Sequence, residues 1–247
     1  MAGAATVEKA LDVLFHLHDA GEAVGLSDIG RALNLPKSSC HRLLSSLVDR
    51  EMVDRDEWGR YRPGLALLSL GIGAQRREPV VSAARPILVR EAEGLGETVF
   101  LVGLRHGRLR VLDKVEGSGF LRAAPGIGDV VPADITAAGK LYSVFGEGGD
   151  ELSPAETREI ANRGAAVNRD AWINGLSVLA VPVWQESGQG PRDLVAVLAV
   201  AAASPRFERL GEQEIETRLL AGAASIGERM SAGGVSRRHD RIGRKSR

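Results

Sequence analysis

The apolar residues of this chain recur with two different spacings, and each spacing predicts its own set of elements. In the first part, apolar residues recur every three or four positions, which is typical of amphipathic helices. This pattern predicts helices over Thr6–Leu17, Ser27–Asn34, a segment opening at Lys37 or Ser38, and Leu65–Arg77. Ahead of the last helix, two short arms flank the turn Asp56-Glu57-Trp58-Gly59 and predict a hairpin over Met52–Arg62.

Polar residues next to these apolar runs mark where the helices begin and end. The hydroxyls of Thr6 and Ser27 can accept from unpaired main-chain N–H groups, so both residues are predicted N-caps. Asn34 closes the second helix, and Pro36 forces a turn before the third. The first helix is expected to bury one face, made of Val7, Ala10, Leu11, Leu14 and Leu17. The third helix is expected to bury Leu43, Leu44, Leu47 and Val48.

The second part of the chain mixes helical and strand-like patterns. The predicted helices are Val80–Glu93, Ile135–Phe145, Pro154–Arg163 and Glu208–Met230. The predicted strands are Glu97–Leu104, Leu109–Glu116, Gly117–Ala124, Leu176–Trp184 and Asp193–Ala202. The first two strands are joined by Arg105-His106-Gly107-Arg108 and read as a hairpin, whereas the last two are continuous apolar runs typical of buried strands. This order predicts an α+β domain with a mainly antiparallel sheet.

Helix, tight turn, helix and hairpin, in this order, predict a winged helix-turn-helix. The third helix carries its polar side chains at its N-terminal end, which is the part of a recognition helix that meets base edges and phosphates. We therefore expect double-stranded DNA as a partner and predict these contact residues: Ser27, Lys37, Ser38, Ser39, His41, Arg42, Arg55, Arg60 and Arg62. The alternative is a sensor or protein-interaction module whose winged helix does not bind DNA.

Charge changes this picture in one respect. The chain has 32 basic and 32 acidic side chains, and residues 1–62 carry eight basic against ten acidic. Because phosphate contacts supply most non-specific affinity, we expect weak binding to random DNA and two copies of the chain on one site.

The end of the chain, residues 233–247, is basic and is read as a disordered tail that either adds phosphate contacts or only aids solubility.

Cysteine content and hydropathy limit the remaining classes. The single cysteine, Cys40, excludes an internal disulfide, and we expect it to be a small side chain facing the neighbouring helix. The chain has no apolar run of membrane-spanning length and no signal-peptide pattern, so a cytoplasmic location without membrane contact is expected. We find no nucleophile elbow, P-loop, dinucleotide fingerprint or metalloprotease helix, and the five histidines are scattered. We therefore expect neither an enzyme nor a cofactor, and no metal site.

Several segments together resemble the IclR family of transcriptional regulators over Thr6 to Met230. They read TVEKALDVL, LNLPKSSCHRLLSSL, GRYRPGLALLSLG, PADITAAGKL and GAAVNRDAWINGLSVLAVPV. The resemblance implies a winged helix-turn-helix followed by a GAF-like α/β effector-binding domain. It also implies homodimers or dimers of dimers on a pseudo-palindromic operator, controlled by a small organic acid, with repression as the more frequent outcome. The expected boundaries are 1–64 for the DNA-binding domain, 65–78 for a linker helix, 79–232 for the effector domain and 233–247 for the tail.

The resemblance also implies an effector site. Its positions in this chain are Thr136, Ala137, Ala138, Gly139, Asn168, Asp170, Trp172, Val178, Ala199 and Ala201. The first N–H groups of a helix are unpaired and the helix dipole is positive there, so the segment starting at Thr136 suits a carboxylate. Val178, Ala199 and Ala201 stand where some relatives carry a cysteine and serines, and Asp134 stands where a histidine is frequent. We therefore expect an effector with an apolar or aromatic body and one anionic end. The alternative is an ordinary strand core around an empty cavity.

Overall fold

The computed structural model describes residues 2–75, 77–118, 125–146, 152–186 and 192–232. Contacts divide the chain into two units, Met1–Arg77 and Glu78–Arg247, which are described separately. The predicted tail, residues 233–247, lies outside the described residues. None of the helices in the described ranges combines the length and hydropathy needed to cross a membrane.

Unit 1 has the element order of a winged helix. Its helices are α1 (Ala2–Ala20), α2 (Leu26–Ala32), α3 (Lys37–Val48) and α4 (Leu65–Gln75), and its strands are β1 (Val53–Arg55) and β2 (Tyr61–Pro63). The two strands pair antiparallel, and Val24 adds a short bridge to Tyr61. The core between α1, α2, α3 and the hairpin is made of Val13, Leu17, Ile29, Cys40, Leu44, Val53 and Tyr61.

Two helix starts in unit 1 differ from prediction. Helix α1 begins at Ala2, so Thr6 lies inside it and is not an N-cap; the alanines that precede Thr6 are the strongest helix formers and extend the helix. Helix α2 begins at Leu26 with Gly25 as N-cap, so Ser27 is not a cap either. The main-chain N–H and C=O of Val24 are both bonded to Tyr61, which makes the chain enter the helix earlier than the sequence pattern suggests.

The buried face of α1 also differs from prediction. Val13 and Leu17 are buried, whereas Val7, Leu11 and Phe15 are exposed, Phe15 to 65%. These three residues lie four positions apart and form a second apolar stripe on the outer face of the helix. The predicted stripe therefore mixed two faces. On α3, Leu44 is fully buried as predicted, Leu47 and Val48 are partly buried against the core, and Leu43 is only partly covered.

Unit 2 is built on an antiparallel sheet with helices on both faces. Its strands are β3 (Thr98–Arg105), β4 (Arg108–Val115), β5 (Ala166–Arg169), β6 (Leu176–Gln185) and β7 (Asp193–Ala203), in the spatial order β4-β3-β7-β6-β5. The β3–β4 turn contains His106 and Gly107, both with positive φ, as a two-residue hairpin turn requires. The α+β prediction with a mainly antiparallel sheet is confirmed: every strand pairing of unit 2 in the described residues is antiparallel.

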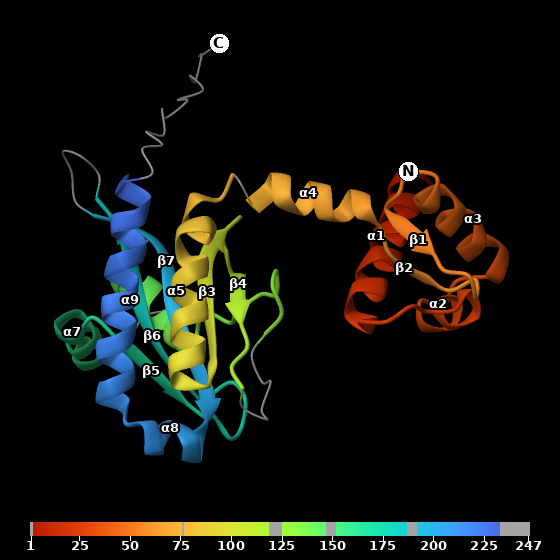
Figure 1. Ribbon diagram of the computed structural model, residues 1–247. Coiled ribbons are helices and arrows are strands. Elements are labelled where there is room, and N and C mark those ends of the chain that lie inside the picture. Colours follow the sequence, from red (N-terminus) through yellow and green to blue (C-terminus); the bar gives the residue numbers. More distant parts are fainter. Residues whose placement is uncertain (1, 76, 119–124, 147–151, 187–191, 233–247) are drawn as a thin grey trace, which may run out of the picture. The chain divides into compact units, whose positions relative to one another are not determined.

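Two layers of apolar residues cover the faces of this sheet. The helices are α5 (Pro79–Leu95), α6 (Ala137–Phe145), α7 (Pro154–Arg163), α8 (Ser204–Leu210) and α9 (Glu212–Ala232). Helices α5 and α9 lie side by side over one face (Figure 1) and bury Leu88, Leu198 and Leu219 with their neighbours. Helix α6 covers the other face, where Leu141 belongs to one buried cluster with Ala180 and Ala199. Most of the predicted effector residues lie on this α6 face.

Three predictions for unit 2 need correction. The strand β5 was not predicted, because four residues are too few for a periodicity. The single helix predicted over Glu208–Met230 is two helices, α8 and α9, separated by Gly211 at a φ of 82°. Gly117 and Ser118 lie in no strand, and residues 119–124 of that predicted strand lie outside the described residues.

Candidate DNA interface and effector site

The N-terminal end of α3 gathers unpaired cations on one exposed surface. Lys37, Ser38, His41 and Arg42 are exposed, and Ser39 is half-buried. Within the described part of the chain, neither Lys37 nor Arg42 forms an ion pair. Because α3 begins directly after Pro36, these side chains occupy its first turns. The surface can therefore offer full positive charge and several hydrogen-bond donors to a polyanion.

The turn between α2 and α3 depends on the left-handed conformation of Asn34 and on the close approach of Leu35 to Gly30. Asn34 adopts a left-handed φ of 51°, which ends α2 as predicted. The Leu35 N–H then donates to the Gly30 carbonyl at 2.8 Å, and a Cβ on Gly30 would approach Leu35 O to 3.1 Å. Ser27, also predicted to contact DNA, is exposed on α2.

Cys40 is buried in α3 and faces the neighbouring helix α2, as predicted. Its thiol lies 3.9 Å from the Leu26 carbonyl, and burial raises the pKa of the thiol. A raised pKa keeps the sulfur protonated and poorly reactive at neutral pH. The residue therefore packs between the two helices of the helix-turn-helix.

The hairpin holds its arginines in local pairs. Arg60 Nε donates to Asp56 Oδ2 at 2.9 Å, and Arg62 lies 3.8 Å from Asp54. Arg55 stacks over the buried Tyr61 ring at 5.6 Å. Of the three predicted hairpin arginines, only Arg55 has no carboxylate partner in the described residues.

The start of α6 is a tightly built helix N-terminus. Thr136 is the N-cap: its Oγ1 accepts from the Gly139 N–H at 3.1 Å and donates to the Pro132 carbonyl at 2.6 Å. A Cβ on Gly139 would stand 1.8 Å from the Ala133 oxygen, so the preceding loop passes against the helix only because position 139 is glycine. The buried amides of Ala137 and Ala138 donate to no acceptor in the described residues.

Strand register places three predicted effector residues in one row. Asn168 of β5 pairs with Val178 of β6, and Val178 pairs with Ala201 of β7. Side chains of directly paired residues point to the same face of a sheet, so all three face α6. Ala199 and the half-buried Trp172 pack in the same apolar cluster. The register thus brings most of the predicted set together with Ala137 and Ala138.

Asp170 does not join this group. Its Oδ1 accepts from the Gly175 N–H at 2.8 Å and from Ser204 Oγ at 3.0 Å, and Ser204 Oγ lies 2.9 Å from Ser177 Oγ. Ser177 pairs with Ala202 and lies on the opposite face of the sheet from Val178. The carboxylate therefore holds the β5–β6 turn against the start of α8.

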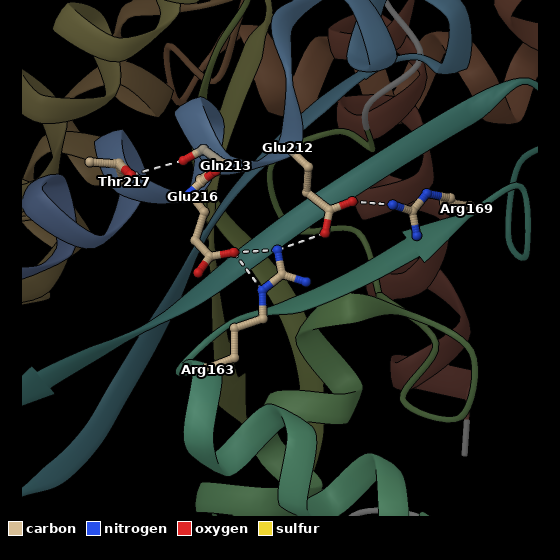
Figure 2. A network of polar contacts seen from close by, with 6 residues as sticks. All are labelled: Arg163, Arg169, Glu212, Gln213, Glu216 and Thr217. Carbon is tan, nitrogen blue, oxygen red and sulfur yellow. Dashed lines mark hydrogen bonds and ion pairs between the residues drawn. The ribbon is translucent and has the colours of Figure 1, made fainter.

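An ion-pair network holds β5 in place from the α9 side. Arg163, at the end of α7, bonds Glu216 and Glu212, and Arg169 of β5 also bonds Glu212 (Figure 2). Burial lowers the pKa of Arg163, but the hydrogen bonds and charges of Glu216 and Glu212 outweigh it, so the pKa is raised. The end of α7 and strand β5 therefore both meet two glutamates of α9. The sequence pattern carries no signal for this network, because its members lie up to 53 residues apart.

A pocket of about 470 Å³ is lined by Trp184 and Ala223 among others, and two further pockets of unit 2 are lined by Tyr142; no predicted effector residue lines any of the three. One, of about 500 Å³, is lined by Leu104, Arg105, Tyr142, Phe145 and Leu194 among others, and a second, of about 270 Å³, by Leu109, Val131 and Tyr142. Tyr142 Oη accepts from the Leu104 N–H at 3.2 Å, and burial raises the pKa of its phenol, although that hydrogen bond and Arg105 lower it. No group of three metal-ligating side chains occurs in the described ranges.

Comparisons with known proteins agree with this arrangement. Residues 6–57 match the family model of the IclR helix-turn-helix domain. The chain is 26% identical over 228 residues to the HTH-type transcriptional repressor AllR of Escherichia coli K12, covering 83% of this chain and 82% of AllR. The Thermotoga maritima IclR structure has a TM-score of 0.73 at 22% identity and covers 91% of this chain and 98% of that one.

A second solved structure has the same fold. It is an IclR homolog from Microbacterium hydrocarbonoxydans complexed with 4-hydroxybenzoate, with a TM-score of 0.71 at 18% identity, covering 92% of this chain and 99% of that one. The helix-turn-helix match, the likeness to AllR over 83% of this chain and the shared fold agree with one another. Residues 6–57 therefore match the IclR helix-turn-helix domain, and the chain as a whole is similar to helix-turn-helix transcriptional regulators of the IclR type.

Proposed function

We propose that this regulator is a repressor that binds a pseudo-palindromic operator as a homodimer, or as a dimer of dimers, and responds to a small organic acid. The observation that carries the DNA-binding part is the unpaired, exposed cationic end of α3 at Lys37 and Arg42. Repression is supported by the likeness to AllR, which is named a repressor.

The apolar surface of unit 1 supports dimer formation. Helix α4 exposes Leu65 to 66% and Leu68 to 59%, and it has no polar side. The outer stripe of α1, made of Val7, Leu11 and Phe15, is a second exposed apolar surface. Exposed apolar area of this kind is stabilised by burial in a partner. A second copy is the partner we propose, because a neutral chain needs two recognition helices on one duplex to bind it tightly.

The α6 face of unit 2 supports the proposed effector site. The unpaired amides of Ala137 and Ala138 lie at a helix N-terminus, where the dipole favours a carboxylate. Val178, Ala199 and Ala201 supply apolar surface in place of side-chain donors. An acid with an aromatic body satisfies both features, and the homolog with bound 4-hydroxybenzoate has the same fold. Thr136, Gly139, Asn168 and Trp172 would shape the site, whereas Asp170 would position the turn.

Effector binding would change DNA affinity by favouring one arrangement of the two units, with α4 as the connecting helix. A coupling free energy of about 1 to 3 kcal/mol is enough for a useful response.

Two measurements test the proposal. The wild-type protein is first used to select duplexes from a random-sequence DNA pool; enrichment of a pseudo-palindrome is expected, and no enrichment would contradict DNA recognition. Thermal unfolding is then measured with 4-hydroxybenzoate and with pyruvate. Saturation at about 100 times the dissociation constant adds about 2.7 kcal/mol of stability, so the aromatic acid should raise the melting temperature clearly. Stabilisation by pyruvate alone would contradict the proposed apolar site. The variant Ala201→Ser, which adds a hydroxyl donor, should shift preference towards pyruvate.

A further inference from the structure

The tip of the unit 1 hairpin exposes a tryptophan. Trp58 lies in the turn between β1 and β2 and is 71% exposed. Tryptophan is highly buried on average, so a nearly free indole at a loop tip is unusual. Tryptophan, tyrosine and arginine are enriched among the residues that dominate the binding energy of protein–protein interfaces.

The turn is held rigid by one carboxylate. Asp56 Oδ1 accepts from the main-chain N–H groups of Trp58 at 3.0 Å and of Arg60 at 2.8 Å. The Gly59 N–H donates to the Asp56 carbonyl at 3.0 Å, and Gly59 has a φ of 76° that favours glycine. The Arg60 guanidinium lies 5.2 Å from the Trp58 ring centroid and is bonded to Asp56. The main chain of the turn is therefore ordered before any partner arrives, which lowers the entropic cost of binding.

The charges around the indole are balanced within the hairpin. The segment 54–62 carries Asp54, Asp56 and Glu57 against Arg55, Arg60 and Arg62. Arg60 and Arg62 lie beside Asp56 and Asp54, in contrast to the unpaired Lys37 and Arg42 of α3. A locally neutral tip gains little from phosphates, because phosphate affinity depends on the release of counterions by uncompensated cations. Its main contribution must come from apolar contact.

We propose that Trp58 enters the minor groove of the operator and packs against sugars and base edges, while α3 occupies the major groove. This inference rests on the proposed DNA-binding function. The minor groove is about 6 Å wide, which admits a hairpin tip or a flat ring but no helix. Apolar side chains used in this way bind the groove without adding charge. Trp58 is then a DNA-contact residue outside the set predicted from the sequence, and Asp56 and Arg60 position it.

The test measures affinity and its salt dependence on the duplex selected by the wild-type protein. Trp58→Ala should weaken binding about tenfold to a hundredfold, because it removes the apolar area buried in the groove, and Trp58→Phe should restore most of the loss. The slope of log affinity against log salt should stay at the wild-type value for Trp58→Ala, because the change removes no charge. Thermal unfolding of Trp58→Ala should match the wild type, because an exposed side chain contributes little to folding. Dimethyl sulfate interference should mark adenine N3 positions in the minor groove for the wild type only.

Three outcomes overturn the inference while leaving DNA recognition intact. The first is a Trp58→Ala affinity within twofold of the wild type. The second is a loss of affinity with a reduced salt slope, which would assign the effect to the charge of Arg60. The third is adenine N3 interference that persists in Trp58→Ala, or its absence from the wild type. If the wild-type protein selects no duplex, the proposed DNA-binding function itself fails. Capture of a protein partner by the wild type but not by Trp58→Ala would then assign the indole to a protein interface.

Discussion

Asp56 bonds Arg60 through both the main chain and the side chain: Arg60 N–H donates to Oδ1 at 2.8 Å, and Arg60 Nε donates to Oδ2 at 2.9 Å. Desolvation raises the pKa of Asp56, but the hydrogen bonds and charge of Arg60 and the amide of Trp58 outweigh it, so the pKa lies below its ordinary value. The ionised carboxylate is therefore part of the hairpin structure.

The order of the hairpin tip should depend on pH in the acid range. Because the folded-state pKa of Asp56 is lowered, its stabilising effect is present above the ordinary Asp pKa of about 3.9 and is lost as pH falls through the folded value. We expect the amide chemical shifts of Trp58 and Arg60 to stay constant above about pH 5 and to change together at lower pH. Nuclear magnetic resonance titration checks this, with a peptide of residues 54–62 as reference. A midpoint no lower than in the peptide would contradict it.

Arg42 and Arg60 should act differently on DNA. Arg42 is exposed at the start of α3 without an ion pair in the described residues, so Arg42→Ala should cost about 1 to 3 kcal/mol on the selected duplex if it reads a guanine. Arg60→Ala should weaken all duplexes similarly and lower the salt slope by less than one, because Asp56 already compensates its charge. Footprints and titrations at several salt concentrations measure both. Equal footprints for the wild type and Arg42→Ala would contradict the assignment of Arg42.

Gly139→Ala should destabilise unit 2. The new Cβ would stand 1.8 Å from Ala133 O, so either the helix start or the loop before it must move. We expect a loss of at least about 2 kcal/mol in the free energy of unfolding, measured by urea denaturation. Gly71→Ala is the matched control: it is also helical, meets no atom within 4 Å, and should stabilise by about 0.5 to 1 kcal/mol. Equal free energies of unfolding for Gly139→Ala and Gly71→Ala would contradict this prediction, because they would show that the loop before α6 can move without cost.

Arg163→Met should lower the free energy of unfolding by about 1 to 2 kcal/mol. The loss is no larger because the ion pairs of Arg163 with Glu212 and Glu216 are partly exposed to solvent. The change leaves Glu212 and Glu216 facing one another without their shared cation. Glu216→Gln combined with Arg163→Met should cost less than the sum of the two single changes, as a double-mutant cycle would show. Arg169→Ala, whose side chain is 60% exposed, should cost at most about 1 kcal/mol. Additive effects of Arg163 and Glu216 would contradict a direct coupling.

Phe15→Glu should weaken self-association of the proposed dimer. Phe15 is exposed on α1 within the outer apolar stripe, so a charge there costs little in the isolated chain but is unfavourable in a buried interface. Sedimentation equilibrium should show a larger dissociation constant for Phe15→Glu than for the wild type. Glu8→Gln, an exposed polar change on the same helix, serves as the control and should leave association unchanged.

Local sequence patterns determined most elements of this protein. Helix α7 matches its prediction at both ends, because Ser153 and Glu156 form a capping box and Gly164 ends the helix at a left-handed φ. The β3–β4 hairpin and the strands β6 and β7 follow equally from local signals. Such elements are specified by residues close together in sequence, whose spacing sets the periodicity directly.

Only the tertiary structure decided which surfaces are buried and which residues meet. Val13 is in the core and Val7 is not, although both suit an amphipathic helix, because the choice depends on where α3 and the hairpin pack. Asn168, Val178 and Ala201 lie in one row through strand register, and Asp170 turns away to Ser204. Burial and pairing arise from contacts between distant segments, and a linear pattern carries no information about their relative placement.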